Sequence, residues 1–190
     1  MPKIAVITDT DASLPLELAS RYQIVQVPII VQFGAESLRA VHDLNDAQAF
    51  ARIDRDGKLP TTSAPSPGQF EQAFRQAFES GYDEILCFTV SGEVSATYNS
   101  ALTAAALFPN QQITVVDTRS LAIGQGFQVL AAAQALESGL SKNEALAAAK
   151  GVSERTHLYA ALATLKYLAM SGRVGHLTAG IANLLDVKPI

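Results

Sequence analysis

Two aspartates directly after the first apolar run have the spacing of a phosphatase active site. The run Ile4-Ala5-Val6-Ile7-Thr8 is typical of a buried strand, and Asp9 and Asp11 follow it two residues apart. In phosphatases of the haloacid dehalogenase type, such a pair supplies a nucleophile and an acid/base group. That chemistry also needs a lysine and a later pair of adjacent acids for magnesium, and neither Glu93 nor Asp117 has an acidic neighbour. A magnesium-dependent phosphatase using Asp9 and Asp11 is therefore the second hypothesis, behind turn and capping roles for both carboxylates.

Three further catalytic patterns are incomplete. Gly124 and Gly126 belong to a partial dinucleotide fingerprint, but they lie too far behind Asp117 to form a strand-to-helix turn, so close helix packing is the simpler role. Residues 91–95 lack the Gly-x-Ser-x-Gly elbow of serine hydrolases, and the sequence ties no histidine to their serines. Three scattered histidines give no metal-ligand spacing, and the single cysteine, Cys87, is predicted to be an inert buried thiol. The sequence therefore predicts no metal site and no cofactor.

Hydroxyl side chains gather in two places that carry no nucleophile pattern. Residues 59–68 contain three prolines and four hydroxyl side chains, which excludes a helix or a central strand and predicts a rigid loop. Residues 91–97 lead from a predicted strand into a predicted helix. Hydroxyls and free N–H groups at a helix N-terminus suit a bound anion such as a carboxylate or phosphate. Helix capping explains these residues equally well, and both interpretations stay open at this point.

Strand and helix patterns alternate along the chain and determine where these residues lie. The expected strands are residues 4–8, 24–33, 84–90 and 113–117. Pro28 favours an edge or a bulge for the second of them. The expected helices are residues 13–22, 45–55, 66–80, 95–107, 123–138 and one that begins after Ser141, with a further strand at 157–162 and two shorter helices behind it. This alternation indicates an α/β fold with a mainly parallel sheet and flanking helices, whose ligands bind beyond the carboxyl ends of the strands.

The composition excludes several classes of protein. Of the 190 residues, 48% are hydrophobic and 17% are charged, which predicts a folded chain with a sizeable core. The net charge of -4, without a basic run, argues against a nucleic acid or an anionic membrane surface as partner. No apolar run reaches the roughly 18 residues of a membrane span, and the first residues do not have the pattern of a signal peptide. Together with the single cysteine, these features predict a cytoplasmic protein.

Five short motifs follow one another along the chain. They are Asp9-Thr10-Asp11-Ala12-Ser13-Leu14-Pro15, residues 59–67, residues 91–101, Val116-Asp117-Thr118, and Ser171-Gly172-Arg173-Val174-Gly175. In this order and spacing they resemble the signatures of the DegV family of bacterial fatty-acid-binding proteins. The resemblance covers essentially the whole chain.

The resemblance implies a carrier that encloses a long-chain fatty acid in an apolar tunnel and presents its carboxylate to a separate kinase. That partner is expected to be a fatty-acid kinase similar to dihydroxyacetone kinases, and the carrier itself is expected not to be an enzyme. Matched onto the family's motifs, Thr62 and Ser95 are the hydroxyls that hold the carboxylate. Arg173 and Ser91 are further candidates for contact with the ligand or the partner.

The physical chemistry of a fatty acid fits that role. Each buried CH₂ contributes about 0.8 kcal/mol, so a chain of about sixteen carbons gains on the order of 10 kcal/mol in an apolar environment. We expect phenylalanine and alanine faces of the helices to line this chain. The carboxylate is costly to bury unless it accepts hydrogen bonds, and the two hydroxyls with the N–H groups beside Ser95 are a minimal set of donors. Ala96, where the family has glycine, narrows the space beside the head group.

The resemblance also predicts the domain organisation. Residues 1–155 are expected to form an N-terminal α/β domain, and residues 156–190 the start of a second domain that acts as a lid. Because members of the family continue well beyond this length, the second domain is expected to be truncated in this sequence, without the late histidine that contacts the carboxylate. We expect an incomplete lid to leave apolar side chains exposed, or to be completed by another copy of the chain.

Overall fold

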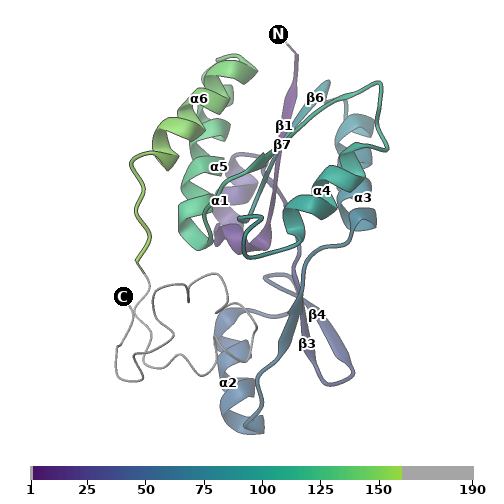
Figure 1. Ribbon diagram of the computed structural model, residues 1–190, viewed down its shortest axis with the longest axis vertical. Coiled ribbons are helices and arrows are strands. Elements are labelled where there is room, and N and C mark those ends of the chain that lie inside the picture. Colours follow the sequence, from purple (N-terminus) through teal and green to yellow (C-terminus); the bar gives the residue numbers. More distant parts are fainter. Residues whose placement is uncertain (1, 160–190) are drawn as a thin grey trace. The chain divides into compact units, whose positions relative to one another are not determined.

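Four parallel strands, in the order β2-β1-β6-β7, form the main sheet of the computed structural model, which describes residues 2–159 (Figure 1). The strands are β1 (Ile4–Asp9), β2 (Val25–Val27), β6 (Glu84–Thr89) and β7 (Gln112–Asp117). The two central strands, β1 and β6, are buried along their whole length except at the first residue of each. The parallel sheet confirms the predicted α/β fold. The apolar runs in the sequence are explained by the burial of these strands on both faces.

Helices cover both faces of the main sheet (Figure 1). On one face lie α1 (Leu16–Arg21), α5 (Ala122–Glu137) and α6 (Lys142–Ser153), and on the other lie α3 (Pro67–Glu79) and α4 (Thr97–Ala105). Successive residues of β1 point to opposite faces. Val6 therefore packs in the same cluster as Val129 of α5, whereas Ile7 packs with Phe70 and Phe74 of α3. The core consists of two apolar layers separated by the sheet.

Three of the predicted helix starts are confirmed by reciprocal capping hydrogen bonds. At α2 (Asp46–Asp56), the Asn45 side chain accepts from the Gln48 N–H at 2.9 Å, and the Gln48 side chain accepts from the Asn45 N–H at 3.0 Å. The starts of α3 and α6 have the same exchange, between Ser66 and Gln69 and between Ser141 and Glu144. These pairs are only three residues apart, so the local sequence is enough to predict them.

The first helix starts later than predicted. Ser13, the first residue of the helix predicted over 13–22, has a left-handed backbone with φ of 51° and ends a short 3-10 helix, η1 (Thr10–Ala12). The Asp9 carboxylate caps η1 by accepting from the Asp11 N–H, and α1 begins only after Pro15. The predicted start at Ser13 is wrong because Asp9 already starts a short helix, and the chain has to end that helix before α1 begins.

The strand predicted at residues 24–33 is divided between two sheets. β2 ends at Val27, whereas β3 (Ile30–Phe33) lies in a small antiparallel sheet with β4 (Glu36–Arg39) and β5 (Thr61–Ser63), in the order β4-β3-β5. Pro28 separates β2 from β3, because proline has no N–H to donate to a ladder. Strand β4 is too polar for the sequence pattern to indicate, and Gly34, with φ of 61°, turns the chain into it. The rigid loop predicted over residues 59–68 is wrong at residues 61–63, because they pair with β3 as the strand β5. β5 lies at the edge of its sheet, in agreement with the exclusion of a central strand.

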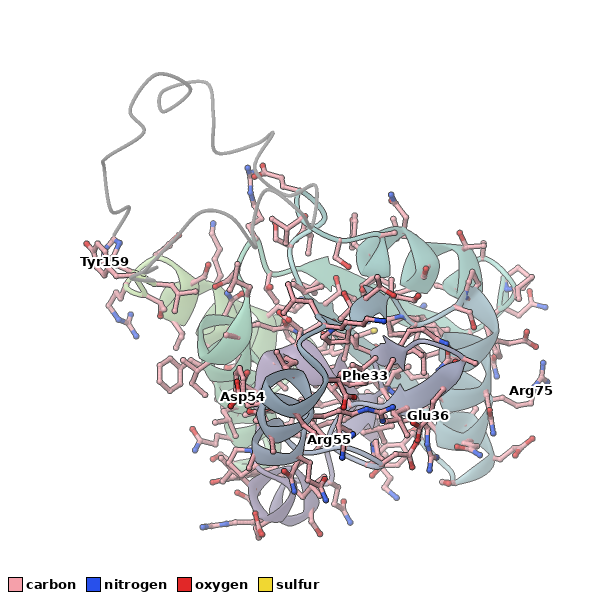
Figure 2. All side chains as sticks on the ribbon, turned by 90° about the horizontal axis from the view of Figure 1, so that it is seen from below. Phe33, Glu36, Asp54, Arg55, Arg75 and Tyr159 are labelled. Carbon is pink, nitrogen blue, oxygen red and sulfur yellow. The ribbon has the colours of Figure 1, made fainter. Side chains whose placement is uncertain are left out.

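Arg52 joins α2 to the small sheet. Its guanidinium carbon lies 4.3 Å from the centre of the Phe33 ring, and its Nη1 lies 2.7 Å from Oε2 of Glu36; Figure 2 labels both partners. No residue of α2 is buried, and Phe50 on this helix is 66% exposed. The small sheet and α2 therefore leave apolar surface uncovered within the described part of the chain.

Residues 2–156 belong to one compact unit, and the last three described residues, 157–159, belong to a second. Residues 156–159 have no regular structure. The rest of the strand predicted at 157–162, the elements predicted behind it, and Arg173 lie outside the described residues. The division predicted between residues 155 and 156 stays a prediction.

The close contact between α5 and η1 requires glycine at position 126. A Cβ atom there would lie 2.4 Å from the carbonyl oxygen of Ala12 and 3.1 Å from Cδ2 of Leu14. We expect Gly126→Ala to lower the free energy of unfolding by about 1 to 3 kcal/mol, because backbone has to move to admit the methyl group. Gly68→Ala is the control, since a Cβ there is 3.9 Å from its nearest neighbour, Oγ of Ser66. Urea unfolding measures both, and equal effects would contradict the packing role of Gly126.

Candidate functional site

Polar side chains gather where β1, β6 and β7 end. Register places Thr8 opposite Phe88 and Thr89 opposite Asp117, so the carboxyl ends of the three strands meet at one edge of the main sheet. This edge is polar although the strands behind it are apolar. The buried polar and charged residues of the described chain are Thr8, Asp9, Thr10, Thr89, Ser91, Thr97, Thr118, Gln125 and Gln128. All of them lie in or next to the segments that follow these strand ends, or in the first half of α5.

Asp9 is the central member of this polar group. Its side chain is 0% exposed and accepts hydrogen bonds from three separate segments: from the Asp11 N–H at 2.9 Å, from the Val90 N–H at 2.9 Å, and from Nε2 of Gln125 at 3.2 Å. Burial raises the pKa of Asp9 from the ordinary 3.8 to about 6. The charge of Asp11 adds to this rise, and the three hydrogen bonds oppose it.

This environment does not suit a phosphatase nucleophile. The Asp9 carboxylate is enclosed and bonded on both oxygens, so it has no approach for a phosphate ester. Asp11 accepts from the Ala122 N–H through Oδ2 at 3.2 Å, which joins η1 to the start of α5. Between residues 2 and 159, no three His, Cys, Asp or Glu side chains are grouped to hold a metal ion. The geometry favours the turn and capping roles for both aspartates over the phosphatase hypothesis.

The turn between β6 and α4, residues 91–95, is fixed by its own hydrogen bonds and by its neighbours. The Ser91 N–H donates to the Ser120 carbonyl at 2.9 Å, and the Ser91 carbonyl accepts from the Ser95 N–H at 3.1 Å. The Ser91 hydroxyl accepts from the Glu93 N–H at 3.3 Å, and this residue is only 6% exposed. Ser91 therefore shapes the turn and presents little surface to a ligand.

Ser95 stands at the start of α4 and is half-buried. Its Oγ accepts from the Thr97 N–H at 3.3 Å and lies 2.8 Å from Oγ1 of Thr97, where either hydroxyl is able to donate. When Thr97 donates, both acceptor sites of Ser95 are used and its O–H is left to donate to an anion. Ser95 thus fills the capping role and still keeps a donor for a ligand, so the two interpretations of this hydroxyl are compatible.

Thr62 lies on a different element from Ser95. It is exposed in the middle of β5, where it pairs with Val31 of β3. Within residues 2–159, no hydrogen bond connects Thr62 with Ser95. The two hydroxyls predicted to hold the carboxylate therefore come from the small sheet and from the main sheet's edge, and Arg173 lies outside the described residues.

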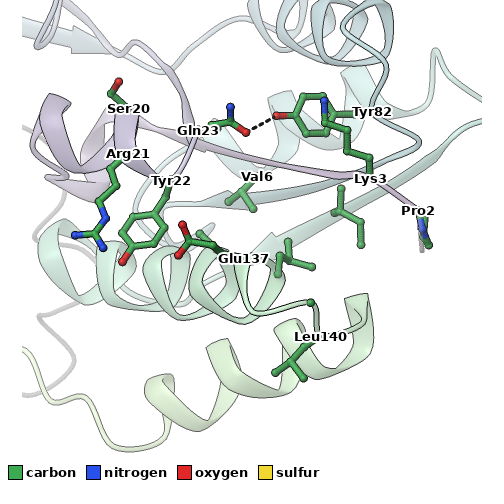
Figure 3. Close-up of a pocket in the computed structure, with 14 residues that line it drawn as sticks. Pro2, Lys3, Val6, Ser20, Arg21, Tyr22, Gln23, Tyr82, Glu137 and Leu140 are labelled. Atoms are coloured by element: carbon green, nitrogen blue, oxygen red, sulfur yellow. Dashed lines mark hydrogen bonds between the residues drawn. The ribbon is translucent and has the colours of Figure 1, made fainter.

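Two cavities lie at the opposite, amino end of the main sheet. One, of about 450 Å³, is lined by Lys3, Tyr22 and Tyr82 among others, and in it the Tyr82 hydroxyl donates to Oε1 of Gln23 at 3.4 Å (Figure 3). The other, of about 480 Å³, lies between the ends of α3 and α4. Neither is lined by Thr62, Ser91 or Ser95. The predicted head-group residues therefore lie outside both cavities, on the turn before α4 and on an edge strand.

The expectation that phenylalanine faces line the ligand fails for α3. Phe70 and Phe74 are 0% exposed, because they fill the core between α3 and the sheet. Large apolar side chains are exposed instead around the start of α5, at Leu121 (40%), Ile123 (36%) and Phe127 (48%). This apolar surface directly follows Ser120, whose carbonyl holds the turn at Ser91.

Sequence reasoning missed Gln125. Its Nε2 donates to Oγ1 of Thr8 at 2.9 Å and to Asp9, while its Oε1 is buried without a partner within the described part of the chain. The available signal was a glutamine between two glycines in an otherwise apolar helix. Gly126 allows α5 to pack against the backbone of η1, which directly follows β1, whereas Gly124 lies against Ser120 and Thr156.

A family model described as "Uncharacterised protein, DegV family" matches residues 3–190. Among curated proteins, a DegV domain-containing protein of Deinococcus radiodurans is 34% identical over 187 residues, which cover 98% of this chain and 66% of that protein. The chain therefore spans 66% of the length of this relative.

Solved structures share the fold at high similarity. One is a DegV family protein from Thermus thermophilus that is described as binding fatty acid. It has a TM-score of 0.86 and 35% sequence identity, and the match covers 98% of this chain and 66% of the Thermus chain. A stearic acid-binding protein from Eubacterium ventriosum has a TM-score of 0.82 and 30% identity, over 100% of this chain and 66% of that one. Among residues 2–159, no helix has both the length and the apolar character needed to cross a membrane.

The raised pKa of Asp9 predicts a dependence of stability on pH. The folded chain binds this proton with a pKa of about 6 and the unfolded chain with about 3.8, so the contribution of Asp9 to stability is fully present below about pH 4 and is lost as the pH rises through 6. The loss is on the order of 3 kcal/mol.

Urea unfolding of the wild type and of Asp9→Asn at several pH values between 4 and 7 tests this. Most other groups titrate alike in both proteins, so the difference in the free energy of unfolding isolates Asp9. We expect the wild type to lose stability relative to Asp9→Asn as the pH rises. A difference that stays constant across this range would refute the assignment.

Proposed function

Because the chain belongs to the DegV family, as its five motifs predict, we propose that it carries a long-chain fatty acid and presents the carboxylate to a separate fatty-acid kinase. The observation that carries this proposal is the half-buried Ser95 hydroxyl at the start of α4. Fatty-acid binding by the structural relatives from Thermus thermophilus and Eubacterium ventriosum supports it. In this proposal the chain is a carrier, and the chemical step belongs to the partner.

The head group binds at the turn before α4. A carboxylate removed from water needs hydrogen-bond donors, because an unpaired buried charge is strongly unfavourable. The Ser95 O–H is one donor. The Thr97 N–H already donates to Ser95 Oγ, but the next N–H groups in the first turn of α4 are further donors, since this turn has no internal acceptors for them. The positive end of the helix dipole adds a favourable interaction with the anion.

Thr62 supplies the second hydroxyl in this proposal. Its exposure on the edge strand β5 leaves its side chain accessible. A carboxylate has two oxygens and about four acceptor positions, so it is able to accept from donors on two different elements at once. Binding of this kind connects the small sheet with the edge of the main sheet.

The acyl chain extends over the apolar side chains around the start of α5. Leu121, Ile123 and Phe127 are exposed there, and the hydrogen bond between Ser91 and Ser120 connects them to the turn that binds the head group. Exposed apolar area of this kind is unfavourable in water and favourable against an alkyl chain. Residues 156–190 are proposed to be the start of the lid domain.

The partner is proposed to be a kinase similar to dihydroxyacetone kinases, which phosphorylates the presented carboxylate. Arg173, outside the described residues, is proposed to contact the ligand or this partner. Ser91 is the weaker candidate for such contact, because it is nearly buried. The net charge of -4 and the single cysteine support a cytoplasmic site of action.

Extraction of the purified protein with organic solvent, followed by mass spectrometry, tests the ligand class. We expect a long-chain fatty acid to be recovered, or to bind to the delipidated protein on addition. The methyl ester of the same acid is the matched ligand control, because it keeps the acyl chain and removes the charged head group. The proposed function would be overturned if no fatty acid is recovered by extraction and none binds to the delipidated protein on addition.

Removal of either proposed hydroxyl is expected to weaken fatty-acid binding. Ser95→Ala and Thr62→Ala each remove a donor to the carboxylate, with an expected loss of about 1 to 3 kcal/mol in binding free energy. Ser20→Ala, an exposed serine on α1, is the control and is expected to bind like the wild type. Titration of delipidated proteins measures all three. If both Ser95→Ala and Thr62→Ala bind fatty acid with wild-type affinity, the carboxylate binds at another site.

A further inference from the structure

Two carboxylates from different strands hold the turn that carries Ser95. Oδ2 of Asp9, at the end of β1, accepts from the Val90 N–H at 2.9 Å. Oδ1 of Asp117, at the end of β7, accepts from the Gly92 N–H at 3.2 Å. β6 lies between β1 and β7 in the sheet, so the two carboxylates reach its continuation from opposite sides.

Asp117 is itself held in place. Its Oδ1 also accepts from the Arg119 N–H at 2.9 Å. The following residue, Thr118, is 2% exposed and donates through Oγ1 to the Thr89 carbonyl at 2.7 Å, which ties the end of β7 to the end of β6. The carboxylate therefore approaches the turn from a fixed position.

Gly92 permits this close approach. A Cβ atom at this position would lie 3.2 Å from Oδ2 of Asp117 and 3.3 Å from Cδ1 of Tyr98. A larger residue has to displace the carboxylate or the ring by a few tenths of an ångström. Glycine at position 92 thus keeps the Asp117 carboxylate in hydrogen-bond range of the turn's backbone.

Asp9 is fixed from the other side of the sheet. Gln125 of α5 donates to its Oδ2 at 3.2 Å and to Thr8 at 2.9 Å, and all three side chains are buried. The Val90 N–H shares the same carboxylate oxygen. The position of the turn is therefore tied to both central strands and to α5.

We propose that Asp117 and Asp9 are positioning residues for Ser95. By holding the N–H groups of Gly92 and Val90, they fix the turn in which the Ser91 carbonyl accepts from the Ser95 N–H at 3.1 Å, and with it the direction of the Ser95 hydroxyl. A donor that is already in place does not have to be ordered when the ligand binds. This role rests on the proposed function, because it takes Ser95 as a ligand of the carboxylate.

The charge of Asp117 and its hydrogen bond have opposite effects on a bound anion. Removing a negative charge near a carboxylate raises its affinity, whereas releasing the turn lowers it. Asp117→Ala removes both the charge and the hydrogen bond, and we expect it to weaken fatty-acid binding about tenfold. Asp117→Asn removes the charge but keeps an acceptor oxygen, so we expect its affinity to stay within twofold of the wild type or to rise. Stronger binding by Asp117→Ala would overturn the positioning role.

Glu93→Ala is the matched control. It also removes one carboxylate, next to Gly92 in the turn, but the Glu93 side chain is 66% exposed and, among the described residues, pairs only with the exposed side chain of Arg119. We expect its affinity to stay within twofold of the wild type. Gly92→Ala disturbs the same hydrogen bond from the side of its donor, because the added methyl group crowds the Asp117 carboxylate. We expect it to weaken fatty-acid binding as Asp117→Ala does. It also keeps the role testable if Asp117→Ala fails to fold.

A double-mutant cycle with Ser95→Ala separates positioning from general stability. In the Ser95→Ala background, Asp117→Ala is expected to change the affinity less than twofold, because the hydroxyl that it positions is absent. An undiminished tenfold loss would show that Asp117 acts independently of Ser95 and would overturn the role. If the wild type binds no fatty acid, the proposed function fails, and this role with it. If the wild type binds fatty acid but the effects of Asp117→Ala and Ser95→Ala are independent of each other, only the positioning role is overturned.

Discussion

The enclosed carboxylate of Asp9 is the constraint on which the arrangement of the site depends. A carboxylate without access to water is stable only when it accepts hydrogen bonds, and its donors here are the backbone of η1, the backbone after β6, and the side chain of Gln125 on α5. These three segments are far apart in the sequence. Because each supplies a donor to the same group, none of them is able to move away without leaving a buried charge underbonded.

The parts of the fold that depend on neighbouring residues could be predicted from the sequence. The three capping boxes and the two central strands are of this kind, since a cap needs a partner three residues away and a doubly covered strand needs an apolar run. The division of residues 24–33 and the polar strand β4 depend on pairing between distant segments, which one sequence does not reveal. The same applies to Gln125, whose partner Asp9 lies 116 residues earlier.

The candidate site was predictable only in part, for a related reason. The carboxyl ends of the strands follow from the α/β pattern, and there the polar cluster is found. Physical argument alone left capping and anion binding equally favoured for Ser95, and the structure makes them compatible because a hydroxyl both accepts and donates. The choice of Thr62 as its companion came from the family resemblance, since nothing in residues 59–68 indicates which distant segment they face.

The small sheet is joined to the rest of the described chain at two crossings, one between β2 and β3 and one between β5 and α3. Each crossing contains proline, at Pro28 and at Pro65, and proline fixes its own φ and restricts the residue before it. The elements that carry Thr62 and Ser95 are thus joined by two short, stiff linkers. The remaining conformational freedom of these linkers determines how far the two hydroxyls move relative to each other. A carboxylate bound to both, as proposed, acts as a cross-link and removes that conformational entropy.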